Sequence, residues 1–266
     1  MRNKVALITG ASSGIGYESA KQLAALGYDL IITARRKEKL EELSLQLYQA
    51  YRTKTNSIAL DMLKENSVSE LINFVKRLDV KVDLVLNNAG FGDYGAFKEA
   101  EISKLENMIT LNVMRLTQLA YHVIPLLSKD AQICNVGSIA SFMPGPYMAT
   151  YYASKSYVLN LSLALQEELK SSTIGVSTFV PGPVATEFNK IAKAHESKKA
   201  STSMKMVGSQ DVESAVQALL EGLQKRKSII YSRKQHRLIV ALIRLVPHSG
   251  IGKIMAKIQK QRFEKE

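Results

Sequence analysis

A tyrosine and a lysine stand four residues apart in the segment Tyr151-Tyr152-Ala153-Ser154-Lys155. In a helix this spacing places both side chains on one face. A phenol with an ordinary pKa of about 10 is a poor base at neutral pH, but a nearby ammonium favours the phenolate and lowers that pKa. The pair is therefore suited to proton transfer at a hydroxyl or carbonyl oxygen.

Ser138 stands thirteen residues before Tyr151, where a short apolar run ends. A tyrosine and a lysine at helical spacing are most often only a surface contact. The neighbouring Tyr147 and Tyr152 have no lysine four residues later, which singles out Tyr151. The catalytic interpretation of Tyr151 depends on a nucleotide-binding motif elsewhere in the chain.

Such a motif, TGASSGIG, runs from Thr9 to Gly16 directly after the first apolar run. Three glycines at this spacing permit a tight turn and a close approach of the backbone to a pyrophosphate, which the next helix attracts with its N-terminus. The alternative is a strand and a helix packed closely with nothing bound. The predicted dinucleotide contacts are Gly10, Ser12, Ser13, Gly14, Ile15 and Gly16.

The end of the second predicted strand indicates which dinucleotide binds. A site that prefers NAD places an acid there, about 20 residues beyond the glycines, to hold the ribose 2′-hydroxyl. This chain has Ala34-Arg35-Arg36 instead, and two guanidiniums can pair with a 2′-phosphate. NADP (NADPH or NADP⁺) is therefore the predicted cofactor. The alternative is the solvated start of a helix, because Lys37 and Lys39 continue the basic run.

Two further segments follow predicted strands. Asp61 could accept a hydrogen bond from an adenine amino group or cap the helix that contains Glu65, and both interpretations stay open. Asn88, Ala89 and Gly90 follow Asn87 at the end of the fourth strand. Small residues at that edge let the backbone pass close to a cofactor.

Seven short apolar runs alternate with longer segments of helical periodicity, which predicts repeated βαβ units in a doubly wound parallel sheet. Each run is interpreted as a buried strand: Val5–Thr9, Leu30–Thr33, Ser57–Leu60, Leu84–Asn87, Ile133–Val136, Val176–Val180 and Ile229–Tyr231. Helices are expected over Arg36–Tyr51, Glu65–Leu78, Ser103–Leu127, Thr150–Lys170 and Ser209–Lys225. We predict one Rossmann-type catalytic domain over residues 1–232 and a basic, amphipathic helical extension over residues 233–266.

Composition excludes several classes of protein. Of 266 residues, 46% are hydrophobic and 23% charged, which is ordinary for a globular protein and excludes disorder, collagen and coiled coil. A single cysteine, Cys134, excludes an internal disulfide and suits a reducing compartment, and the four scattered histidines predict no metal site. No apolar run is long enough to span a bilayer or form a signal-peptide core, so we expect a cytoplasmic protein.

With these motifs in one order and spacing, the sequence over roughly residues 3–232 resembles the short-chain dehydrogenase/reductase family. The resemblance implies a sheet in the order 3-2-1-4-5-6-7 and hydride transfer between nicotinamide C4 and a carbonyl or carbinol carbon. Tyr151 would be the general acid in reduction and the base in oxidation. Ser138 would hydrogen-bond the reacting oxygen, and Lys155 would tune Tyr151 and bind the nicotinamide ribose.

The resemblance also adds residues that the local pattern does not single out. Asn112 matches the family's asparagine that helps to hold a proton-relay water. Asp61 and the backbone of Met62 become adenine contacts, and Arg35 occupies the basic position of members that prefer NADP. The loop that holds the carboxamide end of the nicotinamide would contain Pro181, Gly182, Val184 and Thr186. Members of the family are usually dimers or tetramers, so a homo-oligomer is expected.

Substrate choice depends on loops, where the sequence says less. Six apolar or aromatic residues could line a pocket for a lipophilic ketone or alcohol, although they could equally pack on one another: Phe91, Tyr94, Phe142, Met143, Tyr147 and Phe188. The lysine-rich segment 190–206 is interpreted as a flap that orders over bound substrate.

The C-terminal extension carries most of the net charge of +12. Residues 222–266 contain twelve lysines and arginines against two acids, and Leu238, Leu242 and Val246 recur at helical spacing. A basic amphipathic helix can lie at the surface of an anionic membrane. The alternative, slightly favoured, is a helix pair packed against its own subunit or a second copy.

The sequence therefore predicts an NADP-dependent oxidoreductase acting on a small-molecule carbonyl or alcohol. The competing hypothesis is a non-catalytic, dinucleotide-dependent regulatory or scaffold protein, against which the complete Ser138, Tyr151 and Lys155 set argues. A nucleic-acid partner is not expected, because the basic tail has no recognisable nucleic-acid motif or run of stacking aromatics.

Overall fold

Seven parallel strands form one sheet in the order β3-β2-β1-β4-β5-β6-β7, in a computed structural model that describes residues 3–188 and 209–264. The strands are β1 (Val5–Thr9), β2 (Asp29–Ala34), β3 (Thr55–Ala59), β4 (Val82–Asn87), β5 (Leu127–Val136), β6 (Gly175–Val180) and β7 (Ile229–Tyr231). This order confirms the predicted fold, and all seven predicted runs overlap strands. β4 lies beside β1 although they are distant in sequence. β2 and β3 are therefore on one side of β1, and the strands from β4 to β7 are on the other.

One part of the strand prediction is wrong. β3 is not a buried strand: its residues are half-buried or exposed, as β3 pairs only with β2 at the edge of the sheet. It also ends at Ala59 rather than Leu60. An edge strand has a neighbour on one side only, and its side chains are covered less completely.

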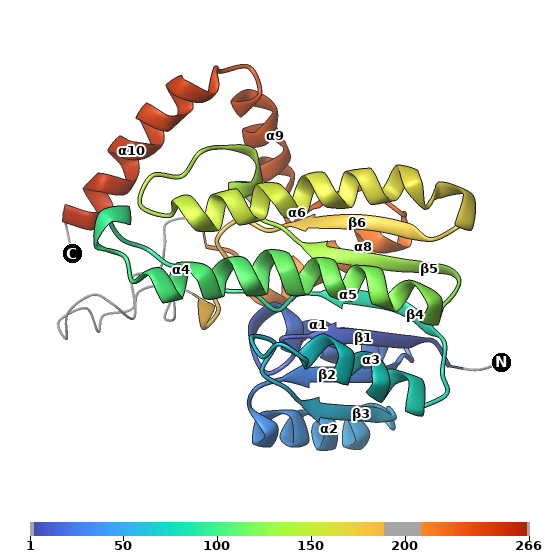
Figure 1. Cartoon of the computed structure of the whole chain (residues 1–266). Helices are drawn as coiled ribbons and strands as arrows, with labels where there is room; N and C mark the ends of the chain where they lie inside the picture. The colour runs from blue at the N-terminus through green and yellow to red at the C-terminus, as the bar shows by residue number, and fades with distance from the viewer. Residues whose placement is uncertain (1–2, 189–208, 265–266) are drawn as a thin grey trace.

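Helices cover both faces of the sheet (Figure 1). One layer contains α1 (Gly14–Ala25), α2 (Lys37–Tyr51) and α8 (Val212–Gln224), and the other contains α3 (Ser67–Arg77), α4 (Ile102–Ile109), α5 (Leu116–Val123) and α6 (Ala149–Glu168). Successive side chains of a strand point to opposite faces. Accordingly Ala6 and Ile8 of β1 pack in the core beneath the first layer, whereas Val5 and Leu7 pack beneath the second.

The predicted helix Ser103–Leu127 is not one regular helix. A π-helical segment, η2 (Thr110–Arg115), separates α4 from α5, and a 3₁₀ turn, η3 (Ile124–Leu126), follows α5. Pro125 lies in that turn, and proline cannot continue an α-helix because it lacks an N–H donor. Leu127, expected at the end of the helix, is the first residue of β5.

The extension forms two helices, α9 (Lys234–Ile243) and α10 (His248–Glu264), which meet at the top of Figure 1 and diverge downward like an inverted V. α9 packs on β7 and on the 3₁₀ turn η4 (Ile139–Phe142). Two further 3₁₀ turns in the described part of the chain are η1 (Phe97–Glu99) and η5 (Lys170–Ser172). None of the helices in the described ranges is long and apolar enough to cross a membrane.

Candidate active site

The glycine-rich loop between β1 and α1 has the shape that its sequence predicts. Gly10 and Gly14 have positive φ angles of 68° and 56°, a region that side-chain-bearing residues rarely adopt. A Cβ atom on Gly16 would lie 2.4 Å from the carbonyl oxygen of Gly10. Ser13 begins α1 without a capping hydrogen bond from its side chain. The free N–H groups at this helix start therefore suit an anionic pyrophosphate.

Hydrogen bonds join this loop to the end of β4. The Thr9 Oγ1 atom accepts hydrogen bonds from the backbone N–H groups of Asn88 (3.0 Å) and Ala89 (2.9 Å). The side-chain amide of Asn88 donates back to the carbonyl oxygens of Thr9 and Gly10. Thr9 was not among the predicted site residues, although its place directly before the first glycine was a signal.

The two arginines after β2 lie in different environments. Arg36 donates to the Ser12 Oγ atom and carbonyl oxygen and pairs with Glu187 at 2.9 Å. Arg35 is exposed and makes no ion pair with another described residue. Arg36 thus braces the glycine loop, and Arg35 is the guanidinium available to a ligand.

Asp61 does not cap a helix, which corrects one of its two interpretations. Its Oδ1 atom accepts from the backbone N–H of Leu63 at 3.0 Å in a turn. α3 begins only at Ser67, with Asn66 at its N-cap, and Glu65 lies outside it. The adenine contact of Asp61 and Met62 stays a prediction.

The structure brings Ser138, Tyr151 and Lys155 together beyond the carboxyl end of β5. All three side chains are buried, and the Ser138 hydroxyl lies close enough to the Tyr151 hydroxyl to lower the pKa of Tyr151. The Ser138 Oγ atom accepts from the backbone N–H of Ala140 at 3.1 Å. Because that N–H occupies a lone pair, the hydroxyl proton is left to donate toward Tyr151 or a substrate oxygen.

Lys155 is held by the sheet. Its Nζ atom donates to the carbonyl oxygen of Val136 at 2.7 Å and lies 5.8 Å from the centroid of the Tyr151 ring. Burial lowers the pKa of Lys155 to about 8. The hydrogen bond to Val136 therefore fixes the Lys155 ammonium one helical turn along α6 from the Tyr151 phenol.

The acidity of Tyr151 differs from the prediction. Burial raises the pKa of Tyr151 to about 12, and the nearby Ser138 hydroxyl offsets only part of that rise. Lys155 is not among the groups that shift this pKa, and dehydration of the phenol is the largest cause. Tyr151 is thus protonated at neutral pH, and in this state it can act as an acid.

Asn112 lies in the π-helical segment η2, and its side-chain amide is fully engaged. Its Oδ1 accepts from the N–H of Phe91 at 3.1 Å, and its Nδ2 donates to the carbonyl oxygen of Phe91 and to Ser154. Ser154 belongs to α6, between Tyr151 and Lys155. Asn112 therefore ties the loop after Gly90 to the catalytic helix, and its role with a relay water stays a prediction.

Ser141 is a further positioning residue that the sequence analysis missed. Its hydroxyl donates to the Lys155 carbonyl oxygen at 2.8 Å and accepts from the Ser138 N–H. It lies three residues after Ser138, which is the spacing of a capping box.

The loop after β6 lies next to the glycine loop. A Cβ on Gly14 would be 3.1 Å from the Thr186 Cγ2 atom, and Val184 pairs with Gln210 in a short β-bridge. Gly182 packs against the His236 ring, where a Cβ would be only 2.4 Å from the ring. The predicted cofactor residues Pro181 to Thr186 thus lie at the same edge of the sheet as the glycines.

The predicted apolar wall is only partly assembled. Phe188 packs on the Tyr151 ring with centroids 5.5 Å apart, and Phe91 joins the same cluster. Phe142 instead stacks on Tyr231 and under the Arg244 guanidinium, at 6.3 and 5.5 Å. Phe142 therefore packs beneath α9 instead of lining the wall beside Tyr151. The predicted flap, 190–206, lies outside the described residues.

The extension also reaches this site, which the sequence analysis did not anticipate. The Tyr94 hydroxyl donates to the Gln259 carbonyl oxygen at 2.7 Å, and the Gln259 side-chain amide donates to the Tyr152 hydroxyl at 3.4 Å. Gln259 is buried. α10 thus links the loop after Gly90 to the residue beside Tyr151, and no local pattern signals so distant a contact.

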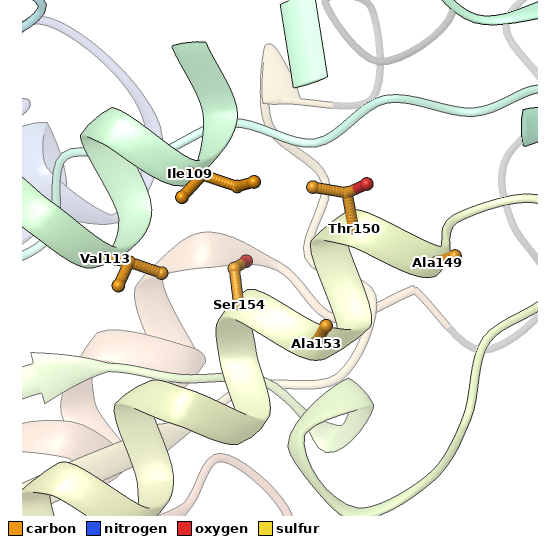
Figure 2. A pocket seen from close by; sticks show the side chains of 6 residues that line it. All are labelled: Ile109, Val113, Ala149, Thr150, Ala153 and Ser154. Atoms are coloured by element: carbon orange, nitrogen blue, oxygen red, sulfur yellow. The ribbon is translucent and has the colours of Figure 1, made fainter. Parts of the chain in front are cut away.

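A shallow hollow of about 390 Å³ lies on a different surface, between α4–η2 and α6. Figure 2 shows the side chains that line it, from Ile109, Val113, Ala149, Thr150, Ala153 and Ser154. None of them is Ser138, Tyr151 or Lys155, although Ser154 stands between the latter two on α6. Among the described residues, no group of three His, Cys, Asp or Glu side chains could hold a metal ion.

Comparison with known proteins decides the family. Residues 4–197 match the short chain dehydrogenase family over most of the chain. This chain belongs to that family. It has the Rossmann-type fold of the short-chain dehydrogenases.

Two relatives of known activity are equally similar. The very-long-chain 3-oxoacyl-CoA reductase of Neurospora crassa is 32% identical over 195 residues, which are 71% of this chain and 58% of that protein. The sulfoacetaldehyde reductase 2 of Chromohalobacter salexigens is 32% identical over 188 residues, which are 69% of this chain and 74% of that protein. This chain thus spans less than two thirds of the length of the Neurospora reductase.

Solved structures show the same fold with either dinucleotide. A short-chain dehydrogenase from Sphingobium yanoikuyae in complex with NADPH superposes with a TM-score of 0.79 at 30% identity, covering 87% of this chain and 88% of that one. A family member from Burkholderia phymatum in complex with NAD has a TM-score of 0.78 at 25% identity, covering 91% and 92%.

Proposed function

We propose that this short-chain dehydrogenase uses NADPH to reduce a lipophilic ketone. The observation that carries the proposal is the buried set of Ser138, Tyr151 and Lys155, with the Lys155 ammonium held by the Val136 carbonyl oxygen, at the sheet edge where the glycine loop lies.

The residues present fit a dinucleotide. Gly10, Gly14 and Gly16 leave a cradle that a Cβ atom would fill, and the uncapped start of α1 offers N–H groups to a pyrophosphate. Gly90, the loop from Pro181 to Thr186 and Lys155 would hold the nicotinamide half. When bound, the cofactor supplies the hydride.

The chain's own residues supply the proton. Tyr151 is protonated at neutral pH, so its hydroxyl can donate a proton to the oxygen of the ketone as the carbon is reduced. The Ser138 hydroxyl hydrogen-bonds the same oxygen, and its position is fixed by the Ala140 N–H. The Lys155 ammonium stabilises the phenolate that forms. Oxidation of the alcohol is the reverse, with the Tyr151 phenolate as base.

Arg35 supports the preference for NADP. Its guanidinium is exposed, the residues that directly follow β2 are Arg35 and Arg36 with no acid among them, and Arg36 is already bound to Ser12 and Glu187. A 2′-phosphate would find one free guanidinium there, which binds phosphate strongly.

Two features support a lipophilic substrate. Phe91 and Phe188 pack around Tyr151 and present apolar surface to the reacting group. One relative is a reductase of very-long-chain 3-oxoacyl-CoA.

A protein with a single cysteine suits the cytoplasm.

The test is NADPH oxidation across ketones, 3-oxoacyl thioesters and long-chain aldehydes, with wild type and Tyr151→Phe. We expect turnover of lipophilic ketones by the wild type alone. Wild-type binding of NADPH without turnover of any carbonyl or alcohol would favour the non-catalytic dinucleotide-binding alternative.

We further propose that copies of the chain associate through the face around the hollow in Figure 2. Ile109, Met114, Tyr121 and Tyr157 are exposed on α4, η2, α5 and α6, and a self-complementary interface needs such apolar, weakly charged surface. Light scattering should give a multimer for the wild type and a smaller mass for Met114→Glu. An unchanged mass would contradict this interface.

A further inference from the structure

The extension has an inner face that packs against the rest of the chain. His236 and Val240 of α9 and Ile251 and Gln259 of α10 are buried. His236 bonds to Ser232 at 3.1 Å, and the Gln259 carbonyl oxygen accepts from Tyr94. The two helices are thus held in a defined position on their own subunit.

The opposite side of the extension, here called the outer apolar face, is uncovered. Leu238, Leu242 and Leu245 are 62%, 57% and 80% exposed. Leu238 and Leu242 lie one turn apart on one side of α9, and Leu245 follows in the turn after this helix. Four further aliphatic side chains of the extension are exposed: Ile239, Val246, Ile254 and Ile258. Neighbouring apolar residues exposed to this degree mark an interaction site more often than a free surface.

The charge around this face has one sign. Residues 233–263 contain no aspartate or glutamate. Lys234, Arg237, Lys253 and Lys257 are exposed, and within the described ranges none of them makes an ion pair. A partner that covers the outer apolar face must therefore offer negative charge to these lysines and arginines and an apolar surface to the leucines.

Neither a second copy of the chain nor a nucleic acid fits both requirements. In a twofold dimer the same surface faces itself, so these lysines and arginines would oppose their own counterparts. Nucleic acid offers phosphates, but it would leave Leu238, Leu242 and Leu245 in water, because its outside is polar. An anionic lipid bilayer offers phosphate headgroups over hydrocarbon, the arrangement that basic amphipathic helices bind.

We propose that α9 and α10 dock this protein onto the surface of an anionic bilayer, with the leucines of the outer apolar face inserted and the lysines and arginines on the headgroups. The helices lie in the plane of the interface and do not cross it. This inference does not depend on the redox reaction, because it concerns residues outside the active site.

The test uses the full chain and sedimentation with vesicles of phosphatidylglycerol and phosphatidylcholine, or of phosphatidylcholine alone. The key variant, Leu238→Glu/Leu245→Glu, changes two exposed leucines and should fold normally. The matched control is Leu26→Glu/Leu45→Glu, since these leucines are also exposed (65% and 58%) but lie at the end of α1 and in α2. Thermal unfolding and light scattering without vesicles accompany each protein.

We expect the wild type and the control to sediment with the anionic vesicles, and the key variant to lose at least tenfold in affinity. Sedimentation of the wild type should weaken with added salt. Three results would overturn the proposal: no vesicle binding by the wild type, equal binding by the key variant, or a wild-type multimer that the key variant alone dissociates. A wild type that binds duplex DNA but no vesicle falls under the first of these results.

Discussion

The catalytic centre and the C-terminal extension differ in what holds their important side chains. Around Tyr151 each functional group is buried and bound by a named backbone or side-chain atom, as Lys155 is by the Val136 carbonyl oxygen. In the extension only one side of each helix is held, and the leucines and lysines of the other side lie in water. The first region therefore holds its functional groups in one fixed geometry, whereas the second leaves a surface that a binding partner can contact.

This difference predicts how each region responds to mutation. Loss of one atom in the catalytic centre removes a chemical step, because no neighbour can replace it. Loss of one side chain of the extension weakens a contact that several others share. Four predictions follow this contrast, in order of decreasing effect.

Tyr151→Phe should reduce turnover by about 10²- to 10⁴-fold, because it removes only the hydroxyl that donates the proton. The binding of NADPH, followed by fluorescence, should stay within a few-fold of the wild type. Tyr51→Phe is the control, since this tyrosine is 47% exposed and lies at the C-terminal end of α2. Full activity of Tyr151→Phe would contradict the mechanism.

Arg35→Ser should weaken NADPH binding by roughly 10- to 100-fold, because a hydrogen bond to a charged group contributes about 1.5–3 kcal/mol. The affinity for NADH, which has no 2′-phosphate, should hardly change. Lys37→Ser serves as the control, since Lys37 pairs with Glu41 at 3.6 Å on α2. If wild type binds NADH as tightly as NADPH, Arg35 does not select the cofactor.

Carbonyl reduction should keep its rate between about pH 6 and 7 and fall as the pH rises through about 8. Burial lowers the pKa of Lys155 to about 8, so the ammonium is charged below that pH and lost above it. Tyr151, with a pKa raised to about 12, stays protonated throughout. The measurement is kcat against pH at saturating NADPH.

Lys155→Arg tests that assignment, because an arginine side chain does not lose its proton in this range. Whatever rate it retains should not fall near pH 8. A wild-type rate that declines below pH 7 would instead require a different titrating group.

Tyr94→Phe should raise KM a few-fold with little change in kcat. It removes the hydrogen bond to the Gln259 carbonyl oxygen, which is worth about 1 kcal/mol, and so loosens the loop after Gly90 without touching the proton donor. Tyr48→Phe, 53% exposed on α2, is the matched control. Equal kinetics of both variants would show that α10 does not restrain the loop.

Much of the fold and the reacting groups could be predicted from the sequence. The alternation of apolar runs and helical segments determined seven strands in a doubly wound sheet, and the glycine spacing determined a loop with two positive φ angles. The four-residue spacing of Tyr151 and Lys155 placed them on one face of α6. These features are local, since they depend on backbone periodicity and on which residues a turn permits.

Other features could be decided only by the tertiary structure. Arg36 bonds to Ser12 rather than staying free beside Arg35, Phe142 packs under α9, and Gln259 meets Tyr94 from 165 residues away. The raised pKa of Tyr151 likewise depends on burial, which no spacing reveals. Each of these features depends on contacts between segments that are distant in the sequence. Local patterns of residues do not show which distant segments pack together.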